Sequence, residues 1–233
     1  SAYSIYAADN ELVKSRIDSS LLAQAYSELS MPADIEAINY CIQAINKHIP
    51  GAAIPLKISD NLRTFDMKTL EVLGRDPIAV ISTSQGDIRV KLFTNHAPAT
   101  VMNFVDLAQQ GYFVDKVVHR AVPNFVIQTG CPRGDGYGSE DYTIRSELSP
   151  LYYLESGYIG MASAGKHTES TQWFITHSPA PHLSGNYTIF GKVEGGMNVV
   201  NSIRIGDNIQ GINIIKDMVN VPLETEQEKD ENN

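Results

Sequence analysis

Cysteine is scarce in this chain, with two among 233 residues, Cys41 and Cys131. Neither forms a metal-ligand pattern with any of the six histidines, because the spacings match no zinc signature. The sequence therefore predicts no metal site, and it contains no motif that calls for a cofactor. Two buried or incidental thiols are the simplest interpretation, and a disulfide between them stays open.

Long apolar runs and an excess of basic residues are also missing. Hydrophobic residues make up 42% of the chain, but no apolar stretch approaches the length of a membrane-spanning helix. The formal net charge is -9, so nucleic acid and anionic lipid are poor partners. Part of that charge lies in residues 223–233, which have the composition of a disordered, acidic tail. These features predict a soluble globular protein with no membrane span and no nucleic-acid partner.

The first 76 residues are predicted to be a helical extension followed by a connector. Residues 9–29 and 32–49 carry apolar side chains at three- and four-residue steps, as amphipathic helices do. Two such helices cannot bury both apolar stripes alone, so they are expected to pack on each other and on another part of the protein. The end of a helical repeat array is the alternative, although no internal repeat is present. Residues 51–76 are mixed and polar, with one short helix predicted around 66–73.

From Pro77 the pattern changes to short β-rich runs. Residues 77–93 predict a hairpin that turns at Gly86, because apolar and polar side chains alternate in its second half. One helix is predicted to begin at Pro98 and to end at Gly111, and a second lies near 196–203. Many short strands with only two helices favour a closed, mainly antiparallel barrel. The further β-rich or apolar runs are 117–121, 124–129, 157–162, 172–176, 188–192 and 211–221.

The segment "VHRAVPNFVIQTG" at 118–130 places one guanidinium, Arg120, and one amide, Gln128, in an apolar strand without an obvious nucleophile, acid or base. Together with three other blocks, this segment resembles the cyclophilin family of peptidyl-prolyl cis-trans isomerases. The four blocks follow the family's order and spacing, so a chance match is improbable. They are "APATVMNFVDLAQQGYF", "VHRAVPNFVIQTG", "GYIGMASAGKHTESTQWFIT" and "HLSGNYTIFGKVEGGMNVVNSI".

The resemblance covers about residues 77–221 and implies a mainly β fold, a closed eight-stranded antiparallel barrel capped by two helices. It divides the chain into a helical extension and connector at 1–76, an isomerase domain at 77–222 and the acidic tail at 223–233. The resemblance also implies that Arg120, Phe125 and Gln128 are catalytic. The implied substrate-binding positions, in the proline pocket and peptide groove, are Val126, Gly136, Ala162, Ser163, Ala164, Gln172, Phe174, His182, Leu183 and Tyr187.

The implied reaction explains why no acid or base is needed. Amide resonance gives the X-Pro bond double-bond character, with a rotational barrier of roughly 18–20 kcal/mol. Twisting the bond localises a lone pair on the prolyl nitrogen, and a donor such as Arg120 stabilises the twisted state more than the planar one. The apolar residues would grip the proline ring while the rest of the peptide turns.

Each of these residues also has a simpler interpretation. Taken singly, the apolar ones would most often be core residues, and Arg120 could form a structural ion pair. His119 invites a general-base role, but its side chain should point away from that of Arg120 in a strand, so a hydrogen-bonded structural histidine is predicted. The run "GDGYG" at 134–138 lacks the lysine and helix of a phosphate loop and predicts a tight turn at the groove edge.

The chain departs from the common family pattern at groove positions. His182 stands where many eukaryotic members have a tryptophan that contributes to cyclosporin binding, so weak cyclosporin binding is expected. Tyr187 stands where histidine is common and resembles the bacterial pattern. The chain begins at Ser1 with no signal peptide in these residues, so a processed product or a piece of a longer protein is compatible with it. The bacterial cytoplasm and the cell envelope both stay open as compartments.

The function implied by the resemblance is isomerisation of X-Pro peptide bonds, which assists protein folding. The partners would be proline-containing peptides and unfolded proteins. The alternative is a peptide-binding or chaperone module that uses the same groove with little turnover. Residues 1–76 lie outside the resemblance and keep that alternative open, because an added helical unit can recruit clients.

Overall fold

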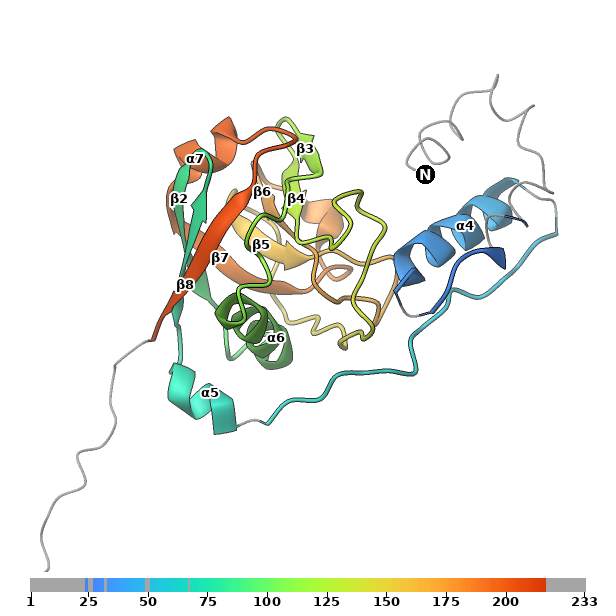
Figure 1. Cartoon of the computed structure of the whole chain (residues 1–233), viewed down its shortest axis with the longest axis horizontal. Helices are drawn as coiled ribbons and strands as arrows, with labels where there is room; N and C mark the ends of the chain where they lie inside the picture. The colour runs from blue at the N-terminus through green and yellow to red at the C-terminus, as the bar shows by residue number, and fades with distance from the viewer. Residues whose placement is uncertain (1–23, 25–26, 32, 49–50, 67, 217–233) are drawn as a thin grey trace, which may run out of the picture.

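The computed structural model describes residues 24, 27–31, 33–48, 51–66 and 68–216 (Figure 1). The acidic tail predicted at 223–233 and most of the helix predicted over 9–29 lie outside these residues. The second predicted helix is present as α4, Ile35–His48. The short helix predicted in the connector is α5, Lys68–Leu73.

One antiparallel sheet of eight strands forms the main body of the protein, in the order β3-β4-β6-β5-β7-β2-β1-β8. The predicted hairpin is confirmed: β1 and β2 pair from Ile78 with Lys91 to Thr83 with Gly86, and Gly86 has a φ of 127° at the turn. The alternation of side chains along β2 places its apolar residues in the core and Asp87 and Arg89 at the surface. The strands are β1 Ile78–Thr83, β2 Gly86–Leu92, β3 Arg120–Val122, β4 Val126–Thr129, β5 Tyr158–Met161, β6 Trp173–Thr176, β7 Ile189–Gly195 and β8 Ile209–Ile215.

The two end strands of this order, β3 and β8, are not paired as strands in the described part of the chain. The residues just before them do meet, because the Val118 amide donates to the Asp207 carbonyl at 2.7 Å and an antiparallel bridge joins Val117 to Asn208. The predicted mainly β fold with eight antiparallel strands is therefore present as a curled sheet. A fully closed ladder of strands is not.

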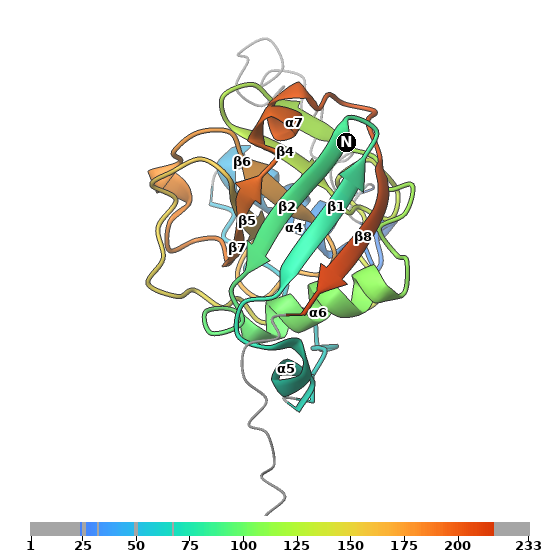
Figure 2. The ribbon, with the colours of Figure 1, turned by 90° about the vertical axis from the view of Figure 1, so that its left-hand side faces the viewer.

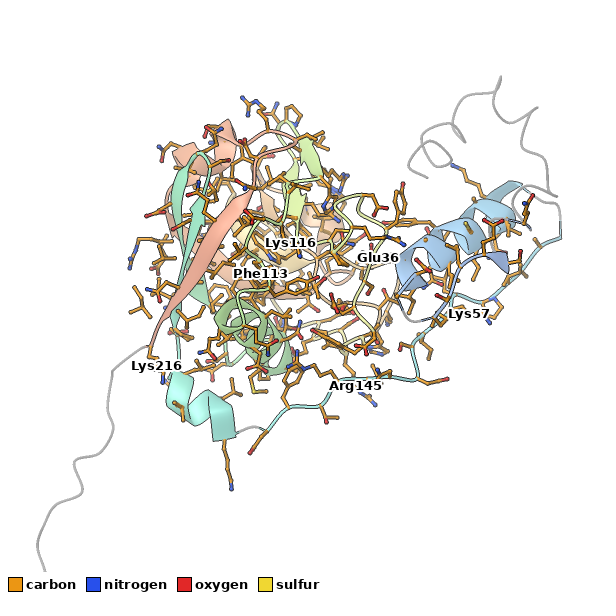
Figure 3. All side chains as sticks on the ribbon, viewed as in Figure 1. Glu36, Lys57, Phe113, Lys116, Arg145 and Lys216 are labelled. Carbon is orange, nitrogen blue, oxygen red and sulfur yellow. The ribbon has the colours of Figure 1, made fainter. Side chains whose placement is uncertain are left out.

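Two helices cover opposite ends of the curled sheet, α6 (Pro98–Gln109) and α7 (Met197–Ser202) (Figure 2). As predicted, α6 begins at Pro98, and the chain leaves it through Gly111 at a φ of 70°, which suits glycine. The ring of Phe104 on α6 packs against Phe113 and Trp173 with centroid distances of 5.3 and 6.0 Å. The large apolar core lies between α6 and the sheet, with Phe113 in its interior (Figure 3).

The connector follows the surface from α4 to α5 (Figure 1). The Arg63 amide donates to the Thr143 carbonyl at 2.8 Å, and the Arg63 guanidinium reaches Asp106 of α6 at 3.0 Å. At the other end, the Asn39 side chain of α4 exchanges two hydrogen bonds with the backbone of Lys57. These contacts attach the connector to both α4 and the barrel.

Candidate functional site

A groove of about 210 Å³ opens where β3, β4 and β6 meet the short 3-10 helix η1, Pro181–Leu183, an element that the sequence did not predict. Ten of the residues implied by the family resemblance line it, together with one residue of α4. The lining residues are Tyr40, Arg120, Phe125, Val126, Gln128, Ala162, Ser163, Phe174, His182, Leu183 and Tyr187.

Arg120 lies at the exposed start of β3 and faces its register partner on β4, Gln128. One guanidinium nitrogen donates to the Gln128 side-chain oxygen at 3.3 Å, and the guanidinium carbon lies 5.5 Å from the centre of the Phe125 ring. Among the described residues no carboxylate forms an ion pair with Arg120. Its positive charge is therefore directed at the groove, and a purely structural ion pair does not account for it.

The apolar part of the groove rests on a small core cluster separate from the main one. Phe174 and Val126 are buried, and the Phe125 ring stacks on the His182 ring with centroids 5.4 Å apart. Gly160 makes room for Phe174, because a Cβ atom there would lie only 2.7 Å from the Phe174 ring. This small apolar pocket beside a guanidinium suits a small, apolar ring such as that of proline.

A chain of amides leads away from Arg120 under the groove. The Gln128 side-chain nitrogen donates to the Gln172 oxygen at 3.1 Å. The Gln172 nitrogen in turn donates to the Gly138 carbonyl at 2.8 Å and to Glu36 of α4 at 2.9 Å. Gln172 is only 1% exposed, so it supports Gln128 from beneath and does not line the open groove.

The remaining predicted groove positions lie beside or below the open pocket. Ala164 lines an adjoining hollow of about 490 Å³, which shares Tyr40 with the first. Gly136 offers its carbonyl to Gln172 at 3.2 Å. The sequence interpretation missed Tyr40 because it lies outside the family resemblance, and its only signal was that Glu36, Tyr40 and Gln43 share a helix face by their spacing.

His119 differs from its prediction as a hydrogen-bonded histidine. Neither ring nitrogen has a hydrogen-bond partner among the described residues, and the ring lies against Gly136. Burial lowers the pKa of His119 to about 4, with Arg120 adding to the effect and Asp135 opposing it. The ring is neutral near pH 7 and lines no part of the groove, so the structure provides no support for a general base there.

No group of side chains suited to a metal ion occurs in the described part of the chain. Cys41 and Cys131 are both free thiols, so the disulfide left open by the sequence is not formed. Among the helices described, none is long and apolar enough to cross a membrane.

The curled antiparallel sheet, with an exposed guanidinium beside a small apolar pocket, has the features of a peptide-binding protein that handles proline. The sequence profile of the family described as "Cyclophilin type peptidyl-prolyl cis-trans isomerase/CLD" matches residues 78–222. The chain therefore belongs to the cyclophilin-type peptidyl-prolyl cis-trans isomerase family.

Relatives and solved structures agree with this assignment. A peptidyl-prolyl cis-trans isomerase of Synechococcus elongatus is 43% identical over 141 residues, which are 60% of this chain and 97% of the relative. Peptidyl-prolyl cis-trans isomerase B of Bacillus subtilis is 41% identical over 128 residues, 54% of this chain and 90% of the relative. The crystal structure of a Cryptosporidium parvum cyclophilin-type isomerase superposes with a TM-score of 0.58 at 31% identity, covering 61% of this chain and 99% of the other.

Proposed function

We propose that the groove carries out the prolyl isomerisation of this family with Arg120 as the main catalytic group. The single observation that carries the proposal is the Arg120 guanidinium, held at the rim of the apolar pocket by Gln128 and Phe125 and in no ion pair with a carboxylate of the described residues. A guanidinium stays charged at all physiological pH values and donates to the prolyl nitrogen as its lone pair localises. Because that lone pair exists only in the twisted state, the interaction lowers the barrier to rotation.

The proline ring would enter between Phe125, Phe174 and Leu183. Gln128 is the second polar group at the pocket, and its amide is held in orientation by Gln172. A fixed amide that binds a peptide carbonyl or amide next to the proline holds one side of the bond while the other turns. The backbone of Ala162 and Ser163 lines the same pocket and offers further polar groups.

The partners proposed are proline-containing peptides and unfolded proteins, and the isomerisation would assist folding. One Cryptosporidium parvum relative was crystallised in the presence of the dipeptide Ala-Pro, with 34% identity to this chain and a TM-score of 0.52. Weak cyclosporin binding remains part of the proposal, because the His182 imidazole, stacked on Phe125, offers less apolar surface than an indole.

A short X-Pro peptide, the unmodified chain and three full-length variants test the catalytic role. Arg120→Ala is expected to lower kcat/KM by about 100- to 1,000-fold, since it removes a donor to the transition state. Arg120→Lys keeps the positive charge but not the planar guanidinium, so its kcat/KM should lie between those of the unmodified chain and Arg120→Ala. Arg145→Ala, at an exposed arginine outside the groove, is the matched control and should match the unmodified chain.

A folded Arg120→Ala protein with an unchanged rate would contradict the role given to Arg120. The alternative function, a binding or chaperone module with little turnover, makes a different prediction. In that case the intact, folded chain binds the peptide, as followed by NMR titration, without accelerating its isomerisation.

Two structural features also belong to the proposal. The division into an extension and connector at 1–76, an isomerase domain at 77–222 and a tail at 223–233 agrees with the limits of the family match. Closure of the sheet into a full barrel is supported by backbone hydrogen bonds from Val118 to Asp207 at 2.7 Å and from Asp115 to Ile209 at 2.8 Å.

A further inference from the structure

Helix α4 presents three polar side chains to the groove from one face. Glu36, Tyr40 and Gln43 are spaced by four and three residues, so they lie on the same side of the helix. The Glu36 carboxylate oxygen accepts from Gln172, Tyr40 lines the open pocket with Arg120, and Gln43 donates to the Ala164 carbonyl at 3.4 Å. Glu36 and Gln43 therefore contact residues to which the family resemblance assigns substrate binding, and Tyr40 lines the pocket itself.

The helix is attached to the groove edge by contacts with the loop at 131–139. The Arg133 guanidinium pairs with Asp34 at 2.6 Å, and the Ser139 amide donates to the Ala33 carbonyl at 3.0 Å. The Tyr40 ring meets the Tyr137 ring edge-on with centroids 5.9 Å apart. Figure 3 shows Glu36 at the junction of helix and barrel, and its side chain is 3% exposed. An ion pair, a backbone hydrogen bond and a ring contact thus hold α4 and the residues just before it against the groove edge.

This interface occupies polar groups of Gln172 and Ala164, two residues that the family resemblance assigns to substrate binding. The Gln172 side-chain nitrogen, which carries two hydrogens, already lies within hydrogen-bonding distance of three oxygens, those of Glu36, Gly136 and Gly138. The carbonyl of Ala164 is partnered with Gln43. Tyr40 stands between the open pocket and the adjoining hollow and lines both. A peptide extending from the pocket toward Gln172 meets α4 in its path.

We propose that α4 covers one side of the peptide groove, and that Tyr40 is a specificity-determining residue that limits how far a substrate extends toward Gln172. This inference rests on the proposed function of the groove. The substrates favoured are those with a short or small-residue segment on that side of the proline. A longer or bulkier segment must displace α4, and its apparent affinity is reduced by the fraction of molecules in which the helix is displaced.

The test compares three peptides on the intact chain and four variants. One peptide has a single residue on each side of the proline, and the other two add three residues before it or after it. Tyr40→Ala opens this side of the groove, and Glu36→Lys places a cation in the buried interface and displaces α4. Glu36→Gln keeps the shape and the hydrogen bond, and Tyr152→Ala truncates an exposed tyrosine outside the groove as the control.

Both Tyr40→Ala and Glu36→Lys are expected to raise kcat/KM by about five- to tenfold for one of the extended peptides, through a lower KM. For both variants, the ratio of kcat/KM for that extended peptide to kcat/KM for the short peptide should rise by about fivefold or more. Glu36→Gln and Tyr152→Ala should behave like the intact chain with all three peptides. Displacement of α4 is followed independently by hydrogen exchange of the Ser139 amide, which donates to the carbonyl of Ala33 just before the helix.

Equal effects on short and extended peptides, or no gain for either extended peptide in Tyr40→Ala, would overturn the proposal. The same holds if Glu36→Lys exposes the Ser139 amide without favouring an extended peptide. Failure of the proposed function is a distinct outcome, because the intact chain would then not isomerise the short peptide either. Arg120→Ala, measured with the short peptide, separates the two cases.

Discussion

The eight-stranded sheet and helix α4 are held in place by different kinds of contact. The sheet encloses a large cluster of buried apolar side chains, including Phe104, Trp173 and Phe190. Among the described residues, neither core cluster includes a residue of α4. The hydrogen bonds and ring contacts between α4 and the barrel involve polar or aromatic side chains, and one of them buries the carboxyl group of Glu36. Ile35, Ile38 and Ile42 of α4 are also buried, but they belong to neither cluster.

This difference separates stability from selectivity. Burial of apolar surface is the dominant stabilising term in folding, and it does not depend on pH. A buried carboxyl group contributes little net stability and makes the interface sensitive to charge. We therefore expect changes in the barrel to act on global unfolding, and changes at the α4 interface to act on docking of the helix and on substrate choice.

The largest effect is expected from Phe104→Ala in the barrel core. The variant should lower the free energy of unfolding by about 3–5 kcal/mol, because it removes a ring that contacts Phe113, Trp173 and Phe190 and leaves a cavity. Denaturant unfolding followed by the fluorescence of Trp173, the single tryptophan, measures the change. Val114→Ala at an exposed site is the control, with an effect within about 0.5 kcal/mol. A cost for Phe104→Ala below 1 kcal/mol would contradict the core assigned here.

Glu36→Lys should weaken the docking of α4 and leave the stability of the barrel unchanged. The substitution places a cation in the buried interface opposite the Gln172 side-chain nitrogen, which is a donor and cannot pair with it. We therefore expect α4 to leave the groove and the Ser139 amide to exchange at least about tenfold faster. The unfolding transition of the barrel, measured with Trp173, should keep its midpoint. A large shift of that midpoint would show that α4 and the barrel form one cooperative unit and would break the comparison.

The docking of α4 should weaken as pH rises. Burial raises the pKa of Glu36 to about 8, with Asp135 acting in the same direction and Gln172 and Arg133 opposing it. When α4 is displaced, the Glu36 carboxyl group has its ordinary pKa of 4.5. Between pH 4.5 and about 8 the docked form therefore binds more protons than the displaced form. Docking is therefore strongest below pH 4.5 and is lost progressively as pH rises to about 8, by at most about tenfold per pH unit.

The measurement for this third prediction is hydrogen exchange of Ser139 between pH 5 and pH 9, corrected for the intrinsic exchange rate. Glu36→Gln is the matched control, since its amide does not titrate and its docking should be independent of pH over this range. A pH dependence that survives in Glu36→Gln would assign the effect to another group.

The smallest effect is expected from Arg133→Gln. The ion pair with Asp34 is short, but the Arg133 side chain is 44% exposed and solvent screens the attraction. Docking should weaken by about 0–1 kcal/mol, and less at high salt. Ser139 exchange at low and high ionic strength measures this. A loss as large as that from Glu36→Lys would mean that the ion pair, and not the buried carboxyl group, anchors the helix.

Most of the barrel was predictable from local sequence signals. The hairpin at Gly86, the helix from Pro98 and the short strands follow from alternation, helical spacing and turn residues. The groove residues came from the family resemblance, and ten of them line one pocket. The sequence was less informative where the outcome depends on packing between distant segments: η1 was missed, and His119 has no hydrogen-bond partner among the described residues. Closure of the strand ladder stays a prediction.

The sequence by itself determined the class of fold, the family and the residues of the pocket, because each of these is encoded in short segments whose spacing is visible along the chain. Only the tertiary structure decided that α4 lies on the groove, with Tyr40 beside Arg120. Glu36 and Gln172 are 136 positions apart, and their contact depends on the path of the connector across the barrel surface. No local pattern specifies such a path, since it depends on contacts between segments that are far apart in the chain, such as Arg63 with Thr143 and Asp106.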